Sequence, residues 1–304
     1  MLSSISSSDR RFLGRLLIWI LLFVPAANVM AGYALRHWPW PTTRVVMAKY
    51  GARTAIEDYV NNQRDCPVVI LGSSVAGALP PPGHDRPGVC TIAMVGQGPY
   101  PGLEIMDRIK AAPRVLFLES NLGFRDSEPG QVAALTEPAQ RTLHYWLPLT
   151  TAQGNWINAL WKSQISMQTN LYRPNIPWAQ WHQEQEVSKP HPAGYDKPMA
   201  DWDRWFVDDH LKHTAALVAA LESRGTKVIF YQSPMEPRIA QQPIFALWAE
   251  KERAAFADHE WVTDDLEKYY LVDGIHFTTG SGEDFFDLLM SHVPPGILPP
   301  DVAR

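Results

Sequence analysis

The sequence has little of what nucleic-acid-binding and metal-binding proteins need. It contains no run of lysine or arginine, and its formal net charge is −5, so it lacks the basic surface that attracts phosphates. Only two cysteines are present among the 304 residues, and neither has the histidine or acid spacing of a metal site. We therefore expect no nucleic-acid partner and no bound metal.

The two cysteines, Cys66 and Cys90, each lie at the start of a short apolar stretch. If these stretches are neighbouring parallel strands, their first residues lie close together, and a disulfide can form in an oxidising compartment. Two buried free thiols are the alternative, because cysteine is often buried as a small apolar residue. The sequence leaves both possibilities open.

One long uncharged run, Leu16–Leu35, lies near the N-terminus. The positive residues ahead of it are Arg10, Arg11 and Arg15. About 20 apolar residues can cross a bilayer, and basic residues ahead of them favour a cytoplasmic N-terminus. We therefore predict an anchor in residues 1–36, so that the chain is a single-pass inner-membrane protein with residues 37–304 in the periplasm. A cleaved signal peptide, with its cleavage site at Val29–Ala31, and a buried core helix are the alternatives.

Short apolar runs alternate with helical patterns in the rest of the chain. The predicted strands are Val68–Leu71, Val89–Val95, Val115–Leu118 and Lys227–Tyr231, and the predicted helices are Thr43–Asn62, Leu103–Ala111, His210–Arg224 and Gly282–His292. This alternation is typical of a parallel sheet, and near-continuous apolar strands indicate that both faces of the sheet are covered. We therefore predict a three-layer α/β/α domain.

One segment, about residues 125–205, interrupts this alternation. It has no clear strand, and seven of the 12 tryptophans of the chain lie between Trp146 and Trp205. A segment of this length is usually functional or has small helices of its own. We interpret it as an insertion in the α/β domain. Trp178 and Trp181 are flanked by glutamines, which favours their exposure.

Small or polar residues follow the predicted strands, and ligands of open parallel sheets bind at that edge. These groups are Gly72-Ser73-Ser74, Gly96-Gln97-Gly98, Glu119-Ser120-Asn121 and, before the last helix, Asp273-Gly274-Ile275-His276. A histidine can take the proton of a serine nucleophile, and an aspartate can fix the tautomer of that histidine. Glycine amides and an asparagine amide can stabilise an oxyanion.

These four blocks, in this order, resemble the four blocks of the SGNH (GDSL) hydrolases, which have a flavodoxin-like sheet. The resemblance implies that Ser74 is the nucleophile, His276 the base and Asp273 its orienting acid. It also implies an oxyanion hole, for which the sequence offers Gly98, with Gly96 as the alternative glycine, and Asn121. Two residues depart from the family pattern: Ser73 and Leu122 stand where the first and third blocks usually have aspartate.

GSS variants with an N-terminal anchor resemble the cell-envelope branch of this superfamily, which includes proteins of alginate and cellulose O-acetylation and of teichoic-acid D-alanylation. This resemblance implies acetyl transfer to, or acyl-ester hydrolysis on, an exported polysaccharide, with a membrane-bound acyltransferase partner as the acyl source. Trp178 and Trp181 would stack on the sugar rings. Because of the departures at Ser73 and Leu122, a non-catalytic polysaccharide-binding or assembly subunit is the alternative.

A rival motif is the glycine-rich run Gly96–Gly102 (GQGPYPG), which follows a predicted strand, with Glu119 about 20 residues further on. This is the outline of a dinucleotide-binding fingerprint. However, Pro99 and Pro101 remove two backbone amides where a pyrophosphate needs donors. We therefore expect no nucleotide cofactor.

Overall fold

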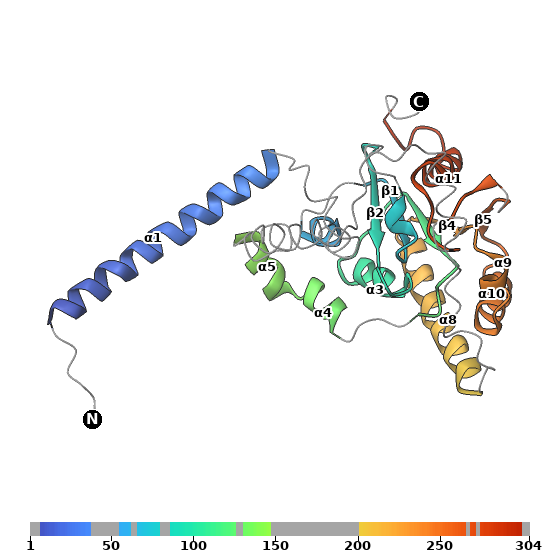
Figure 1. The fold of residues 1–304 in the computed structure, drawn as a ribbon, viewed down its shortest axis with the longest axis horizontal. Helices are drawn as coiled ribbons and strands as arrows, with labels where there is room; N and C mark the ends of the chain where they lie inside the picture. The colour runs from blue at the N-terminus through green and yellow to red at the C-terminus, as the bar shows by residue number, and fades with distance from the viewer. Residues whose placement is uncertain are drawn as a thin grey trace.

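The computed structural model describes residues 7–37, 55–61, 66–79, 86–125, 130–146, 201–265, 268–271 and 274–299. A five-stranded sheet lies at its centre, in the order β2-β1-β3-β4-β5, and every neighbouring pair of strands is parallel (Figure 1). The strands are β1 (Val68–Gly72), β2 (Val89–Ala93), β3 (Val115–Glu119), β4 (Lys227–Gln232) and β5 (Glu260–Thr263). The parallel α/β sheet is confirmed, and β5 is a strand that the sequence did not predict.

The strands β1 and β3 form the middle of the sheet and are buried along their whole length. Because successive side chains of a strand point to opposite faces, each of these apolar strands contributes to two separate cores. Leu71 and Leu116 belong to one core, whereas Ile70 and Phe117 belong to the other. Full burial of each such side chain stabilises the fold by roughly 1.5–3 kcal/mol.

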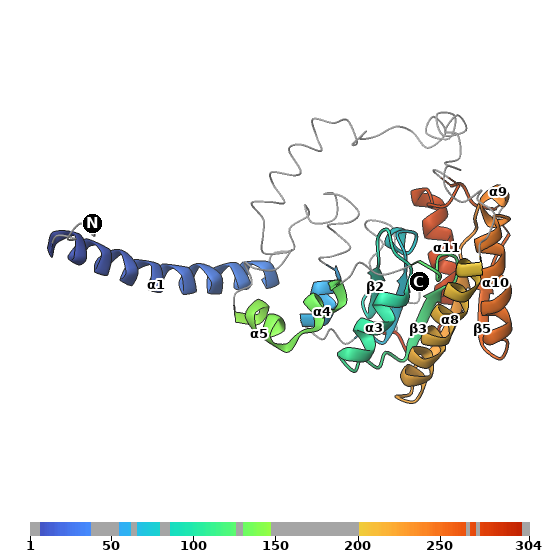
Figure 2. The ribbon, with the colours of Figure 1, turned by 90° about the horizontal axis from the view of Figure 1, so that it is seen from below.

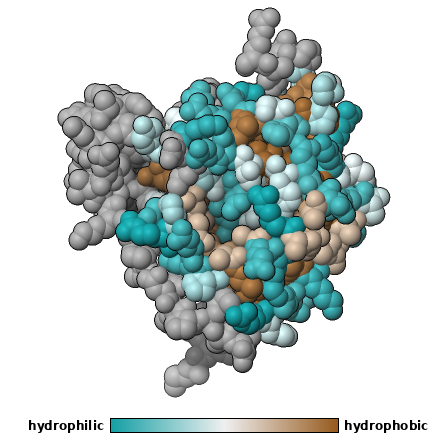
Figure 3. Space-filling model, turned by 90° about the vertical axis from the view of Figure 1, so that its right-hand side faces the viewer, coloured by the Kyte–Doolittle hydropathy of each residue, from teal (hydrophilic) through white to brown (hydrophobic). Residues whose placement is uncertain are grey.

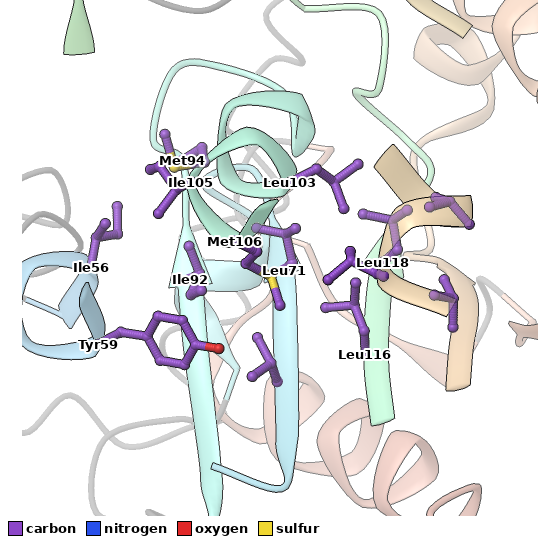
Figure 4. Close-up of a cluster of buried hydrophobic side chains, with 14 of the residues drawn as sticks. Ile56, Tyr59, Leu71, Ile92, Met94, Leu103, Ile105, Met106, Leu116 and Leu118 are labelled. Atoms are coloured by element: carbon purple, nitrogen blue, oxygen red, sulfur yellow. The ribbon is translucent and has the colours of Figure 1, made fainter. Parts of the chain in front are cut away.

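Helices cover both faces of the sheet, as Figures 1 and 2 show. The first core packs against α3 (Tyr100–Arg108) and α8 (Asp201–Glu222), and Figure 4 shows Leu103 and Met106 of α3 beside the strand residues. The second core packs against α11 (Thr279–Ser291), through Phe285, Phe286 and Leu289. This arrangement is compatible with the predicted three layers.

Two further helices, α9 (Pro237–Ala240) and α10 (Pro243–Ala255), follow β4 and were not predicted. Trp248 of α10 packs directly on the turn after β3, because a Cβ atom at Gly123 would lie 2.2 Å from its ring. Phe245 of α10 makes an edge contact with Phe124 of the same turn, with ring centroids 5.0 Å apart. Figure 3 shows this side of the molecule, where hydrophilic residues separate small apolar patches.

The predicted insertion is described only at its ends. It contains α4 (Gln131–Thr136) and α5 (Pro138–Trp146), and α8 begins near its C-terminal end. Residues 147–200, which include Trp178 and Trp181, lie outside the described residues. Within the predicted helix Thr43–Asn62, residues 55–61 are described and are helical. The short 3₁₀ helix η2 (Ala76–Ala78) follows β1.

The N-terminal helix α1 (Ser7–His37) contains Pro25. Crossing a bilayer needs about 20 predominantly apolar residues in one helix. In the part of the chain that the structure describes, no helix meets the requirements of length and apolar character for a membrane span. This finding contradicts the predicted location, a single-pass inner-membrane protein with its catalytic domain in the periplasm.

A disulfide joins Cys66 and Cys90, whose Cα atoms lie 5.8 Å apart. Cys66 lies two residues before the start of β1, and Cys90 is paired with Val69 in the parallel ladder of β1 and β2. The two cysteines therefore meet because their strands are neighbours, and of the two possibilities left open by the sequence the structure contains the disulfide.

Candidate active site

Ser74 and His276 meet at the carboxyl edge of the sheet. The Ser74 Oγ and His276 Nε2 atoms are 2.8 Å apart, although the two residues are separated by 202 positions in the sequence. Ser74 lies just after β1. In the strand order β2-β1-β3-β4-β5, the chain passes from β1 to β2 on one side and then crosses back to β3 on the other side of β1. Ligands of open α/β sheets bind at such a point, so the Ser74–His276 pair lies where a substrate would bind.

The turn that presents Ser74 is short because Gly72 has no side chain. A Cβ atom at Gly72 would lie 2.3 Å from Glu119 Oε2 and 2.7 Å from Tyr231 Oη. After Gly72 the chain leaves the sheet, and the carbonyl of Ser74 accepts a hydrogen bond from the amide of Gly77 at 3.2 Å. Ser74 is half-buried in this turn, so its hydroxyl is held by the fold and still reachable.

His276 is positioned by a loop that is tied to the segment after β4. The carbonyl of Gly274 accepts a hydrogen bond from the amide of Glu236 at 2.8 Å. Gly274 has a φ of +86°, a conformation that residues with a side chain rarely adopt. Phe277 then forms an isolated bridge with Leu271. The predicted orienting acid, Asp273, lies outside the described residues.

The two candidate glycines after β2 differ in their surroundings. Gly98 is buried, and a Cβ atom there would lie 2.3 Å from the carbonyl oxygen of Leu122 and 3.1 Å from that of Arg125. Gly96 is exposed and has a φ of +81°. The structure therefore brings Gly98, rather than Gly96, against the backbone of the turn after β3.

Asn121 lies in the turn after β3, and its side-chain amide is buried. Its Nδ2 donates a hydrogen bond to the carbonyl of Ser233, and its Oδ1 accepts one from the amide of Ser233, both at 2.7 Å. One N–H of the Asn121 amide is thus used to join the ends of β3 and β4. The other N–H is the donor that the predicted oxyanion role requires.

Two buried glutamates lie beneath the site, and no role there was predicted for either of them. Glu119, at the end of β3, accepts hydrogen bonds from the amide and hydroxyl of Ser73. Glu252, on α10, accepts hydrogen bonds from the hydroxyl of Ser120 and from Trp248 Nε1. In the sequence, Glu119 is recognisable as a single carboxylate at the end of an otherwise apolar run. Nothing in the sequence of α10 indicates that Glu252 lies beneath the site.

Burial dominates the electrostatics of these groups. It raises the pKa of Glu119, and the hydrogen bonds from Ser73 and the charge of His276 partly oppose this effect. It raises the pKa of Glu252 to about 8, opposed by the hydrogen bonds from Ser120 and Trp248. It also raises the pKa of Tyr231, as does the nearby charge of Glu119. The neutral form of Glu252 is therefore the main one at neutral pH.

The carboxylate of Glu119 has no access to a ligand, because it is fully buried and bound to Ser73. This position does not suit the ribose contact of the rival dinucleotide motif. Among the described residues, no group of three histidine, cysteine, aspartate or glutamate side chains could hold a metal ion.

A comparison with protein-family models found no match, and comparisons with curated proteins and with solved structures found none either.

Proposed function

We propose that this protein is a serine-dependent acyltransferase or esterase of the SGNH type. The observation that carries the proposal is the 2.8 Å contact between Ser74 Oγ and His276 Nε2. A serine hydroxyl is a weak nucleophile and needs a base within hydrogen-bond reach, about 2.6–3.2 Å. The strand order, with Ser74 after β1 and Asn121 after β3, also supports this assignment.

The proposed reaction has two halves. In the first, His276 Nε2 takes the proton of Ser74 Oγ, which attacks the carbonyl carbon of an acyl ester and forms a tetrahedral oxyanion. The intermediate collapses, His276 returns the proton to the leaving oxygen, and the acyl group stays on Ser74. In the second half, water or a sugar hydroxyl gives its proton to His276 and attacks the acyl carbon. The bond from that carbon to Ser74 Oγ breaks, and His276 returns the proton to Ser74 Oγ.

The oxyanion needs hydrogen-bond donors that are already in place. We assign this role to the second N–H of the Asn121 amide and to the backbone amides of Gly98 and Ser74. The contact of Gly98 with the Leu122 carbonyl brings the turns after β2 and β3 together, which supports the assignment. Asp273, as the acid that orients His276, remains a prediction from the DxxH block.

The acceptor is the part of the proposal that depends on the resemblance alone. An acetyl group and a polysaccharide acceptor follow from the cell-envelope branch named above, and Trp178 and Trp181 are the residues predicted to stack on its sugars. The difference between transfer and hydrolysis lies in whether the acceptor site excludes water.

The test is covalent trapping of the acyl group on the full-length chain. We expect p-nitrophenyl acetate to add an acetyl mass to the intact wild-type protein, and Ser74→Ala to abolish it. Ser223→Ala, a change at an exposed serine on another part of the molecule, should keep it. His276→Gln should slow acylation about 100-fold or more, whereas His292→Gln, which alters a histidine paired with Glu260, should not.

A cello- or manno-oligosaccharide added to the acylated protein then distinguishes the two possible second half-reactions, transfer and hydrolysis. An acetylated sugar indicates transfer, and free acetate indicates hydrolysis. Acylation that persists in Ser74→Ala would refute the mechanism. A wild-type protein that binds these sugars and never becomes acylated would favour the non-catalytic polysaccharide-binding or assembly subunit.

A further inference from the structure

Glu119 places a carboxylate directly behind the turn that carries Ser74. It is the last residue of β3 and is paired in register with Tyr231 of β4. Its side chain is fully buried, and the missing side chain of Gly72 leaves the space that its carboxylate fills, because a Cβ there would lie 2.3 Å from Glu119 Oε2. A charged residue is rarely buried completely without partners that compensate for lost hydration.

These partners all belong to the Ser74 turn. The amide of Ser73 donates to Glu119 Oε2 at 2.7 Å, and the Ser73 hydroxyl donates to Oε1 at 2.8 Å. The Ser73 oxygen in turn accepts a hydrogen bond from the amide of Val75 at 3.2 Å. One side chain from β3 therefore holds, directly or through Ser73, the residues on both sides of Ser74.

The charged and titratable groups that face Glu119 come from three other elements. Tyr231 faces it from β4, Glu252 from α10 and His276 from the loop before α11. Burial raises the pKa of Glu119, and the donors of Ser73 lower it. The positive charge that His276 acquires when it takes the Ser74 proton also favours the carboxylate form of Glu119.

We propose that Glu119 is a positioning residue for the nucleophile, and that its carboxylate holds the turn Ser73–Val75 so that Ser74 Oγ meets His276 Nε2. This inference rests on the proposed function. It also gives Ser73 a role, since Ser73 stands where the SGNH pattern usually has aspartate. In this chain the carboxylate at that place comes from β3, and Ser73 connects it to the turn.

The first test compares acylation in Glu119→Gln with acylation in the wild type, using p-nitrophenyl acetate and the full-length chain. Glutamine keeps the size of the side chain and one acceptor oxygen, but its NH2 group cannot replace the second oxygen as an acceptor for the amide and hydroxyl of Ser73. We expect the acylation rate constant to fall about 10- to 100-fold, because a small misplacement of a reacting group has an effect of this size. The KM should change little, since Glu119 does not touch substrate.

Controls separate this role from a general loss of folded protein. Glu250→Gln makes the same change at an exposed position of α10 and should acylate at the wild-type rate. The folded fraction of each variant is measured by circular dichroism, and rates are compared per folded molecule.

A rescue experiment tests the position of the carboxylate itself. Ser73→Asp alone places a second carboxyl against Glu119, which should destabilise the protein and slow acylation. Ser73→Asp combined with Glu119→Gln restores a single carboxylate beneath the turn, so this double variant should acylate at least about 10-fold faster than Glu119→Gln. If Glu119 acted only by filling space, Ser73→Asp would slow acylation in the Glu119→Gln variant as it does in the wild type.

Three results would overturn the inference, and they are distinguishable. If the wild type itself forms no acyl-enzyme, the proposed function fails and the role of Glu119 fails with it. If the wild type is acylated and Glu119→Gln is acylated equally fast per folded molecule, only the role of Glu119 fails. The same holds if the double variant is no faster than Glu119→Gln.

Discussion

Asn121 and Ser233 exchange two hydrogen bonds, in which the asparagine amide both donates to and accepts from the serine backbone at 2.7 Å. The pair connects the turn after β3 with the end of β4. Asn121 is therefore a structural link as well as the proposed oxyanion donor, and its amide plane is fixed before any substrate binds. A fixed donor needs no reorganisation during the reaction.

Replacement of Asn121 separates these two roles. Asn121→Ala leaves the amide and carbonyl of Ser233 without their partner, so the free energy of unfolding should fall by about 2–4 kcal/mol. Loss of an oxyanion donor should also slow acylation about 100- to 1,000-fold per folded molecule. Urea denaturation and acylation by p-nitrophenyl acetate measure the two effects. A destabilised variant with normal acylation would show that Asn121 is only a structural link.

The sequence was sufficient for the middle of the sheet because β1 and β3 are continuous apolar runs with clear boundaries. The proximity of Ser74 and His276 could also be anticipated, since Ser74 follows the first predicted strand and His276 precedes the last predicted helix. β5 escaped prediction because Glu260–Thr263 has only four residues, of which Val262 alone is buried. Too few positions alternate in such a strand for a pattern to emerge.

The hydrogen bonds of the site could not be derived from sequence in the same way. The contact of Asn121 with Ser233 depends on the register between β3 and β4, in which Glu119 is opposite Tyr231. Glu119 was visible as a carboxylate after an apolar run, but its orientation toward Ser73 depends on the space that Gly72 leaves in the neighbouring strand. Such relations require the three-dimensional pairing of strands that are far apart in the chain.

Two glycines near Ser74 should respond very differently to the same small substitution. Gly72→Ala would place its Cβ 2.3 Å from Glu119 Oε2 and 2.8 Å from Ala76 Cβ, whereas Gly77→Ala meets only the Cβ of Ala93 at 3.4 Å. We expect Gly72→Ala to lower the free energy of unfolding by about 1–3 kcal/mol and to slow acylation, because overpacking displaces the turn. Gly77→Ala should be close to wild type. Thermal unfolding of both variants checks this, and equal melting temperatures would contradict it.

The disulfide between Cys66 and Cys90 encloses the Ser74 turn, with a separation of 24 residues between the cysteines. A loop of this length restricts the unfolded chain enough to contribute about 3 kcal/mol. The native protein should therefore show no thiol that reacts with Ellman's reagent, even after denaturation. Cys66→Ala combined with Cys90→Ala should unfold at lower urea concentration. Two reactive thiols in the denatured, non-reduced wild type would contradict the presence of the disulfide.

The buried carboxyl of Glu252 should make the stability of the protein depend on pH. Burial raises its pKa from 4.5 to about 8, so in the folded protein it stays protonated in a range where the unfolded chain ionises. The stabilising effect of this proton is complete below the unfolded pKa and is lost as the pH rises through the folded pKa. Wild-type stability should therefore fall between about pH 5 and pH 8 because of this group, by roughly 3–5 kcal/mol at most.

Glu252→Gln removes this titration while keeping acceptor and size, so the variant should gain stability relative to the wild type as the pH rises from 5 to 8. The difference should then level off, because the wild-type group is ionised in both states above its folded pKa. Urea denaturation at a series of pH values measures this difference, and Glu250→Gln on the exposed side of the same helix is the matched control. A difference that is the same at pH 5 and pH 9 would mean that Glu252 is ionised in the folded protein at every pH in this range, and that Ser120 and Trp248 compensate fully for its burial.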